Sequence, residues 1–363
     1  GDRSKRPGQQ SNPDTYVHIT ERRPDGIVIR GTKSIVTGAP YMHEFLVMPC
    51  RTHRAEDSAF AVACAVPVDA EGVTIVARPA GRPGEAAAMF SAKYGQSVGV
   101  VMFDDVFVPH DNVFLAGETE EGGFLTTSYA THHRHSCIGA RAGFGDLLIG
   151  AGALITEANG LDLDEHHHMR DAMVELITIT ESFFACGVAA SVYYTQDPGG
   201  SVMPDPVFSN IGKLLLATKI YDMHRVAHYV SGGLIVSLPG PDEDHNPETK
   251  ASLAEVLGGR SDIPAKQRLE VARFIEDLTA SHQAGWYSVI SLHGGGSPEA
   301  MKREIWRNYP VHEKVDIVQR LLDRDILDQG QRSSRQPGRC CAKGCEVPKD
   351  IASAEPSTPS GSD

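Results

Sequence analysis

Two stretches, VGVVMFDDVFVP (98–109) and THHRHSCIGARAGFGDLLIGA (131–151), lie on either side of a change in apolar pattern near Gly122. The first is a run of β-branched and aromatic residues, which is typical of a strand. The second belongs to a longer segment, 124–158, whose apolar residues recur at helical spacing. The change predicts an α+β chain in which strands come first and helices follow.

Before Gly122 the sequence contains short strand-like runs separated by Gly, Pro and Asp. They are GIVIRG (26–31), HEFLVMP (43–49), AFAVACAVPV (59–68), GVTIVARP (72–79) and VGVVMFDDVFVP (98–109). Such closely spaced runs predict an antiparallel barrel or sandwich, and we expect this small β domain over 1–118. No GxGxxG motif follows a strand, which argues against a dinucleotide-binding βαβ unit.

After Gly122 the apolar spacing predicts a series of helices. The segments are 124–158, 168–196, 207–236, 264–292 and 298–327. In the third, the apolar face is read from Ile211, Leu214, Leu215, Thr218 and Tyr221. Turn-rich breaks between the segments predict an antiparallel helical bundle over 119–328. From Gln329 the chain is rich in Ser, Pro and Gly, and we expect a disordered tail over 329–363.

Length and composition narrow the class of protein. The 363 residues suffice for about two domains, and the formal net charge is −13 without a long basic run. We therefore expect neither nucleic acid nor an anionic membrane surface as a partner. No stretch is expected to reach the ~20 apolar residues of a membrane-spanning helix. Seven scattered cysteines favour a reducing, cytoplasmic compartment over a disulfide framework. Because the first residue is Gly1 rather than Met, we expect the chain to start within a longer protein.

The densest group of reactive side chains lies in 131–151. On a helix, His133, Cys137, Ala140 and Arg141 share one face. An imidazole and a thiolate one turn apart can ligate iron or zinc, and an arginine can hold an anionic or carbonyl oxygen. From spacing alone, a helix packed on its neighbours with solvated histidines is the favoured interpretation, and the functional one stays open.

Two further segments can contact a cofactor. SLHGGGSPEAMKREIWRNYP (291–310) contains three glycines before a Ser-Pro helix start, which suits a phosphate or flavin cradle or a tight interhelical turn. GDRSKRP (1–7), with Thr37-Gly38 between two strands, can bind a polar cofactor or can be an irregular terminus. Glu165 to His168 is interpreted as a solvated turn. Cys340, Cys341 and Cys345 stay unassigned.

Six segments in this order resemble one flavoprotein family. They are GDRSKRP (1–7), GIVIRGTKSIVTG (26–38), HEFLVMP (43–49), FDDVFVP (103–109), HHRHSCIGARAG (132–143) and HGGGSPEA (293–300). The family contains the 4-hydroxyphenylacetate 3-monooxygenases and, more similar to this chain, 4-hydroxybutyryl-CoA dehydratase. The resemblance runs from Gly1 to about Asp325. It implies an acyl-CoA dehydrogenase-like fold, FAD, a homotetramer, and an N-terminal helical domain absent from this sequence.

The resemblance also implies roles for single residues. The FAD contacts carried over are Gly1, Asp2, Arg3, Ser4, Thr37, Gly38, His293, Gly294 and Gly295. The catalytic positions carried over are His133, Cys137 and Arg141, of which Cys137 replaces a tyrosine and Arg141 a lysine. His133 matches a histidine ligand of a [4Fe-4S] cluster, whereas Ala140 stands where a cysteine ligand is expected. Two expected glutamates are replaced, one within Ser97-Val98-Gly99 and one at Ile290.

Three functions follow as hypotheses. The first is a FAD-dependent oxidoreductase or lyase of the dehydratase type that acts on an acyl-CoA or a similar activated acid. The second is an aromatic hydroxylase that uses reduced flavin and oxygen on a phenolic acid. The third is a catalytically degenerate scaffold subunit, which the replaced carboxylates favour, since proton removal from carbon needs a positioned base.

Overall fold

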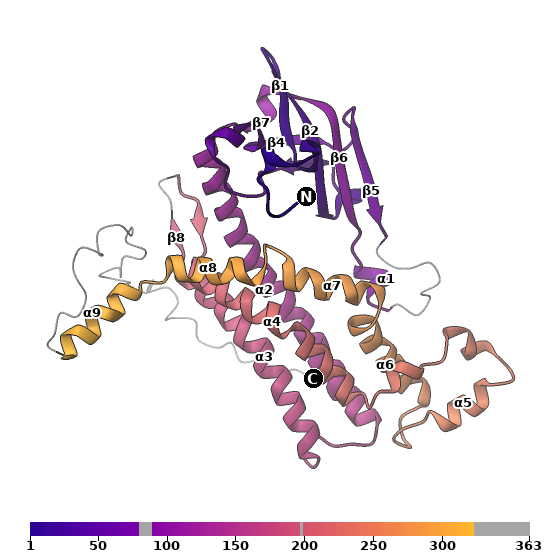
Figure 1. Cartoon of the computed structure of the whole chain (residues 1–363). Helices are drawn as coiled ribbons and strands as arrows, with labels where there is room; N and C mark the ends of the chain where they lie inside the picture. The colour runs from indigo at the N-terminus through magenta and orange to yellow at the C-terminus, as the bar shows by residue number, and fades with distance from the viewer. Residues whose placement is uncertain (80–88, 197–198, 323–363) are drawn as a thin grey trace, which may run out of the picture. The chain divides into compact units, whose positions relative to one another are not determined.

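The computed structural model describes residues 1–79, 89–196 and 199–322 (Figure 1). The chain divides into two compact units, 1–303 and a second that begins at Glu304. The predicted tail, 329–363, and its three cysteines lie outside the described residues. The predicted domain bounds at 118 and 328 stay predictions.

Two antiparallel sheets form before Gly117 in the described chain. One has the strand order β1-β2-β6-β5 and the other the order β3-β4-β7. The strands are β1 (His18–Arg23), β2 (Gly26–Thr37), β3 (Glu44–Val47), β4 (Val62–Pro67), β5 (Val73–Arg78), β6 (Val98–Pro109) and β7 (Val113–Ala116). One buried apolar cluster draws side chains from both sheets, among them Ile29, Val47 and Phe103. The two sheets therefore share a core.

Helices dominate after Glu118, with one short hairpin of β8 (Thr195–Gln196) and β9 (Val202–Met203) between them. The described helices are α1 (Ser91–Tyr94), α2 (Thr119–Ala158), α3 (His167–Val192), α4 (Pro206–Val230), α5 (Lys250–Val256), α6 (Ala265–Thr279), α7 (His282–His293), α8 (Pro298–Asn308) and α9 (Val311–Leu322). The helix α4 begins where it does because Pro206 suits a first helical position and the Asp205 side chain accepts the Phe208 N–H.

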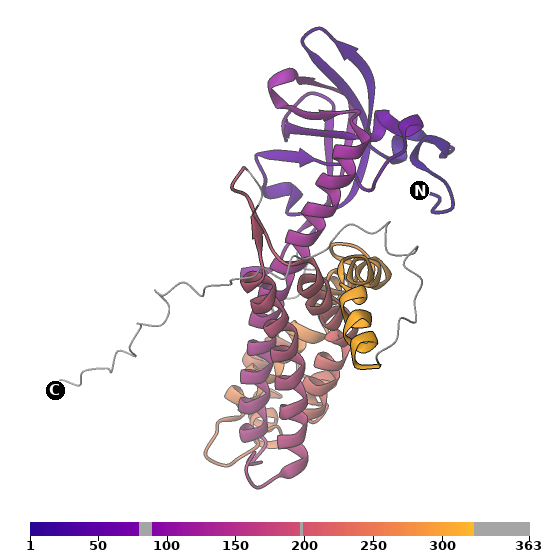
Figure 2. The same cartoon turned by 90° about the vertical axis from the view of Figure 1, so that its left-hand side faces the viewer.

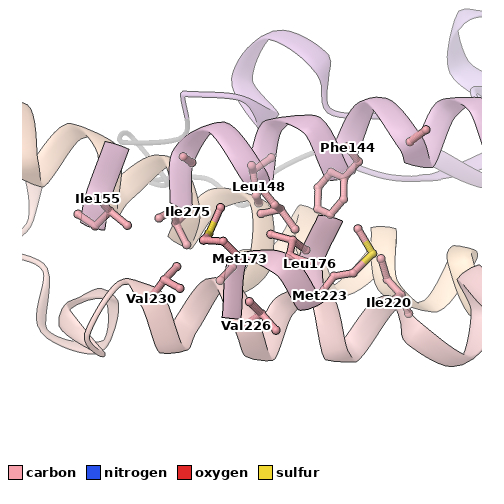
Figure 3. Close-up of a cluster of buried hydrophobic side chains, with 14 of the residues drawn as sticks. Phe144, Leu148, Ile155, Met173, Leu176, Ile220, Met223, Val226, Val230 and Ile275 are labelled. Carbon is pink, nitrogen blue, oxygen red and sulfur yellow. The ribbon is translucent and has the colours of Figure 1, made fainter. Parts of the chain in front are cut away.

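The long helices α2, α3 and α4 run side by side, and α6 packs on α2 and α4 (Figures 1 and 2). Their contact is apolar. Leu148, Leu176, Met223 and Ile275, one from each of these helices, are fully buried in a single cluster (Figure 3). Burial of this surface is the main force that holds the helices together.

The face of α4 that is buried differs from the one read from the sequence. Thr218 and Tyr221 are exposed, whereas Lys213, Leu216 and Ile220 are fully buried. The sequence reading followed the apolar residues alone, and so it passed over a polar side chain on the packed face. This correction brings Lys213 into the interior.

Other element predictions also differ. The predicted helix 264–292 is two helices, because Ser281 ends the run by capping α7: its hydroxyl accepts the Ala284 N–H. The predicted helix 298–327 is broken before Val311, since Pro310 cannot donate a backbone hydrogen bond. The strands β1 and β7 and the helix α5 were not predicted, because they are short or carry charged residues.

By length and composition alone, α2 and α3 are apolar enough to cross a membrane. This finding differs from the expectation that no stretch reaches that length. Half of the most apolar window of α2 is buried among other helices, as is 28% of that of α3. Core helices of proteins that never enter a bilayer meet the same two criteria.

Candidate active site

His133 and Cys137 lie one turn apart on α2, as the spacing predicted. The Cys137 sulfur is 3.5 Å from His133 Nδ1, and both residues are half-buried. The ring of Tyr129, one turn earlier, lies 5.8 Å from the imidazole. The pair is therefore close enough to share a proton and still open on one side.

Arg134 joins three segments at this pair and was missed by the sequence analysis. Its Nε donates to the Gly295 carbonyl over 2.9 Å, and its Nη1 donates to Asn210 Oδ1 over 2.8 Å. Asn210 in turn donates to the Pro206 carbonyl at the start of α4. The Arg134 side chain is buried, so its hydrogen bonds fix the turn after α7 against α2 and α4.

Arg141 is held on two sides. Its Nε donates to Ser291 Oγ over 2.7 Å, and its guanidinium carbon lies 3.6 Å from the centroid of the Tyr287 ring. Ser291 Oγ donates to the Tyr287 carbonyl one turn earlier on α7. The Tyr287 side chain also hydrogen-bonds to the guanidinium. Among the described residues no carboxylate forms an ion pair with Arg141, so its positive charge has no anionic partner there.

Lys213 reaches the same turn of α7 from α4. Its side chain is fully buried, and its ammonium donates to the Ser291 carbonyl. Burial lowers the pKa of Lys213 to about 8, and the neighbouring Arg141 and Arg134 act in the same direction, while Cys137 opposes them. A lysine in an apolar face is the sequence signal that could have revealed this residue.

The electrostatic character of the site is positive. Burial lowers the pKa of His133, and the charges that add to this effect are Lys213, Arg134 and Arg141. The imidazole is therefore neutral at neutral pH. Burial also raises the pKa of the Tyr287 hydroxyl, although Arg141 opposes the shift. The site suits a negatively charged oxygen better than a cation.

The glycine turn HGGG packs directly on α2. Gly295 has φ +75°, and a Cβ placed there would lie 2.9 Å from His133 Nδ1. A Cβ at Gly294 would lie 3.5 Å from His133 Cε1. The close approach that requires glycine is thus to α2, whereas contact of His293, Gly294 and Gly295 with a flavin stays a prediction. His293 itself is exposed.

The strand segment that carries Thr37 and Gly38 contains local strain. Ile35 has φ +96°, which is rare for a β-branched residue, and its side chain is 73% exposed. It lies in an irregularity of β2 between Ser34 and Val36. Thr37 is exposed, and its hydroxyl makes no hydrogen bond to another described residue. Strain of this kind is found where a ligand is bound.

The opening loop is folded on itself. The Asp2 carboxylate accepts the Ser4 N–H over 2.9 Å and the Ser4 hydroxyl over 2.7 Å, and these bonds lower the pKa of Asp2. The Asp2 N–H donates to the side chain of Gln10, against which Gly1 also lies. Arg3 is exposed. The hydrogen bonds thus fix the loop without joining Gly1, Asp2, Arg3 or Ser4 to the α2 group.

The side chains around His133 do not make a metal site on their own. Among the described residues, no group of three or more His, Cys, Asp and Glu side chains is arranged to hold a metal ion. His133 and Cys137 supply two donors, and Ala140, on the same helix, supplies none. These residues therefore do not fit a [4Fe-4S] cluster, which takes four ligands.

Comparison with known proteins identifies the family. Residues 1–115 match the N-terminal domain of 4-hydroxyphenylacetate 3-hydroxylase, and residues 123–323 match its C-terminal domain. A 4-hydroxybutyryl-CoA dehydratase/vinylacetyl-CoA-Δ-isomerase from Clostridium aminobutyricum is 31% identical over 336 residues, which cover 88% of this chain and 67% of that protein. The chain thus spans about two thirds of the length of such relatives.

Solved structures agree with this assignment. An oxygen-tolerant archaeal 4-hydroxybutyryl-CoA dehydratase from N. maritimus superposes with a TM-score of 0.85 at 31% identity, covering 90% of this chain and 66% of that one. The oxygenase component of 4-hydroxyphenylacetate 3-monooxygenase, in complex with FAD and 4-hydroxyphenylacetate, gives 0.81 at 23% identity, over 89% and 67%. Glutaryl-CoA dehydrogenase gives 0.54 at 15% identity, over 92% and 66%, a weaker likeness of fold alone. The chain belongs to the 4-hydroxyphenylacetate 3-hydroxylase family.

Proposed function

We propose that the protein is a FAD-dependent enzyme of the dehydratase type that acts on an acyl-CoA or a similar activated acid. The observation that carries this proposal is the positive group around His133, in which Arg141 has no carboxylate partner among the described residues. A thioester that loses a proton next to its carbonyl becomes an enolate, and a fixed guanidinium stabilises such an oxyanion. The 31% identity to a 4-hydroxybutyryl-CoA dehydratase supports the choice of thioester.

FAD as the cofactor is supported by the residues near the end of β2. Ile35 offers an exposed apolar surface held in a strained backbone, and the Thr37 hydroxyl, two residues later, has no hydrogen-bond partner among the described residues. An apolar face beside a polar edge suits a flavin ring, and Gly38, Arg3 and Ser4 can add polar contacts. When bound, FAD supplies hydride or single-electron transfer at the carbon next to the carbonyl. A relative of similar fold was solved with FAD.

His133 is the proton carrier in this proposal. Its lowered pKa keeps the imidazole neutral at neutral pH, and a neutral imidazole can accept a proton from carbon and return it. Cys137, 3.5 Å from Nδ1, fixes the orientation of the imidazole. Arg141 holds the carbonyl oxygen on which charge develops.

The positions of the two replaced glutamates support a proton carrier on α2. Ser97 is buried and its hydroxyl donates to the Arg78 carbonyl. Gly99 lies against Ala39, where a Cβ would be 2.9 Å away. Ile290 is part of α7, and its carbonyl accepts the Gly294 N–H. None of these positions holds a group that can take a proton from carbon, so another residue must perform that step, and His133 is the one we propose.

The test uses the complete gene product, purified without oxygen. We expect bound flavin, and conversion of 4-hydroxybutyryl-CoA or a related thioester that a His133→Gln variant lacks. Flavin with about four irons per chain would mean that ligands outside the described residues complete a cluster. Absence of flavin after denaturation would overturn the proposal and favour a scaffold subunit.

Size-exclusion chromatography with light scattering tests the homotetramer that we propose from the same resemblance, and fractionation of cells tests a cytoplasmic location.

A second candidate is an aromatic hydroxylase that uses reduced flavin and oxygen. Ala140 favours it, since a reaction without an iron–sulfur cluster does not need the missing ligand. The fold likeness to a 4-hydroxyphenylacetate 3-monooxygenase component is consistent with it. Oxygen consumption with reduced FAD and 4-hydroxyphenylacetate, coupled to formation of a catechol, would select this function over the first.

A further inference from the structure

Ser291 is the junction between two buried cations. Its hydroxyl accepts from Arg141 Nε over 2.7 Å and donates to the Tyr287 carbonyl over 2.6 Å. Its carbonyl accepts from the Lys213 ammonium. Ser291 is itself 1% exposed. Donors and acceptors therefore match at every contact, and the hydroxyl has one orientation in which both of its bonds form.

This junction fixes the direction in which Arg141 points. The Nε edge of the guanidinium is bound to Ser291 and one face lies on Tyr287, so the terminal nitrogens have a defined orientation. A planar guanidinium recognises an oxyanion through parallel hydrogen bonds. Lys213 reaches the same serine from another helix, which ties α4 to the last turns of α7.

We propose that Ser291 and Lys213 are positioning residues that aim the terminal nitrogens of Arg141 at an anionic oxygen of the substrate, an enolate or a carboxylate. This inference rests on the proposed function, because it assigns the group that Arg141 meets. Ser291 acts through Arg141, and Lys213 acts through Ser291. The positive charge of Lys213 also favours the anion over its neutral form, and a bound anion offsets the cost of burying two cations together.

The alternative is that both residues only stabilise the helices. Substitution would then lower stability and would leave the preference for a charged ligand unchanged. A thioester that exists as both ketone and enolate separates the two cases. Acetoacetyl-CoA is such a probe, since its enolate absorbs ultraviolet light and its apparent pKa on the protein reports how strongly the site favours the anion.

The experiment titrates flavin-loaded, full-length protein with acetoacetyl-CoA and with neutral butyryl-CoA over a range of pH. The variants are Ser291→Ala, Lys213→Met and, as a matched control, Lys219→Met, an exposed lysine on α4 that pairs with Asp222. For Ser291→Ala and Lys213→Met we expect the enolate to bind about tenfold or more weakly. We expect the pH of enolisation to rise, with butyryl-CoA binding and flavin content unchanged. Lys219→Met is expected to match the wild type.

Each outcome decides the question. Equal enolisation in the wild type and in Lys213→Met overturns the positioning role while leaving the proposed function in place. Parallel loss of both thioesters shows a structural role and also overturns it. If the wild type binds neither thioester but prefers 4-hydroxyphenylacetate over its neutral amide, the acyl-CoA function fails. Loss of that preference in Lys213→Met would then still support the positioning role of Ser291 and Lys213. Binding of none of these probes to the flavin-loaded wild type overturns both. Lys213→Met, which replaces a buried ammonium by an apolar chain of similar length, keeps the test valid if Ser291→Ala does not fold.

Discussion

The guanidinium carbon of Arg141 lies 3.6 Å from the centroid of the Tyr287 ring, which places a cation against an aromatic face. Such contacts contribute about 1–2 kcal/mol when water is excluded. We expect Tyr287→Leu to lower the free energy of unfolding by at least that amount, and Tyr287→Phe, which keeps the ring, to lower it less. Urea denaturation followed by circular dichroism measures both variants. Equal losses would show that the hydroxyl, rather than the ring, holds Arg141.

Lys213 predicts a dependence of stability on alkaline pH. Its pKa is about 8 in the folded protein against an ordinary value of 10.5, so between these pH values the unfolded chain binds the extra proton. The free energy of unfolding therefore rises as pH rises from 8 to 10.5, by about 3 kcal/mol for a shift of this size. We expect Lys213→Met to lack that rise in urea denaturation at pH 7.5, 9 and 10.5. A parallel profile for wild type and variant would contradict the burial of this charge.

His224 predicts a dependence of the same sign at acidic pH, where stability again increases with pH. Burial, with a smaller effect of His228, lowers the pKa of His224 from 6.5 to about 4. Between pH 6.5 and pH 4 this histidine is protonated in the unfolded chain but not in the folded protein. The free energy of unfolding therefore falls as pH falls through this range, again by about 3 kcal/mol. We expect thermal unfolding of His224→Gln to vary less with pH over this range. His168→Gln, at an exposed histidine, is the control, and it should keep the wild-type profile.

Two glycines near the ends of α7 give a matched pair of substitutions. Gly295→Ala is strained by φ +75° and would bring Cβ to 2.9 Å from His133 Nδ1, so we expect lower stability and a displaced imidazole. Gly285→Ala meets no atom within 4 Å inside a helix, and we expect it to raise stability by about 0.5–1 kcal/mol. Melting temperatures test the stabilities, and the NMR titration of His133 tests its environment. An unshifted His133 resonance in Gly295→Ala would mean that the turn after α7 moves and the imidazole keeps its place.

The buried Asp277 anchors the segment before β6 to α6. Its carboxylate accepts the N–H groups of Phe90 and Ser91 and the Ser91 hydroxyl, over 2.6–2.8 Å. We expect Asp277→Ala to cost about 2–4 kcal/mol, because buried donors lose a charged acceptor. Differential scanning calorimetry measures the cost. Asp262→Ala, at an exposed carboxylate, is the control and should change stability little.

The strands were predictable from the sequence where their pattern is strong. The run VGVVMFDDVFVP and the strand β6 have the same bounds, Val98–Pro109, because most of its residues are valine or phenylalanine, which favour strands. β1 escaped prediction because most of its residues are polar and exposed. The local sequence indicates only the strand propensity of a segment. The exposed edge strand β1 forms because it pairs with β2, and that pairing depends on the tertiary structure.

The residues of the candidate site also differ in how far the sequence could predict them. His133 and Cys137 were found because helical spacing alone brings them together. Lys213, Ser291 and Tyr287 come from α4 and α7, and no spacing within one helix reveals a contact between helices. A lysine at the spacing of Leu216 and Ile220 was the available signal, and reading only apolar residues concealed it.

The helix α2 is continuous over 40 residues, about 60 Å, from the strands to the centre of the bundle. Near its start, Gly122 lies against Leu115 and Ala61, where an added Cβ would be 3.2 Å from the leucine. His133 follows about three turns later on the same rigid element. A larger side chain at Gly122 would therefore shift the imidazole along with the helix. The geometry of the candidate site can therefore be altered from a contact three helical turns away, and Gly122 is a position at which to search for such changes.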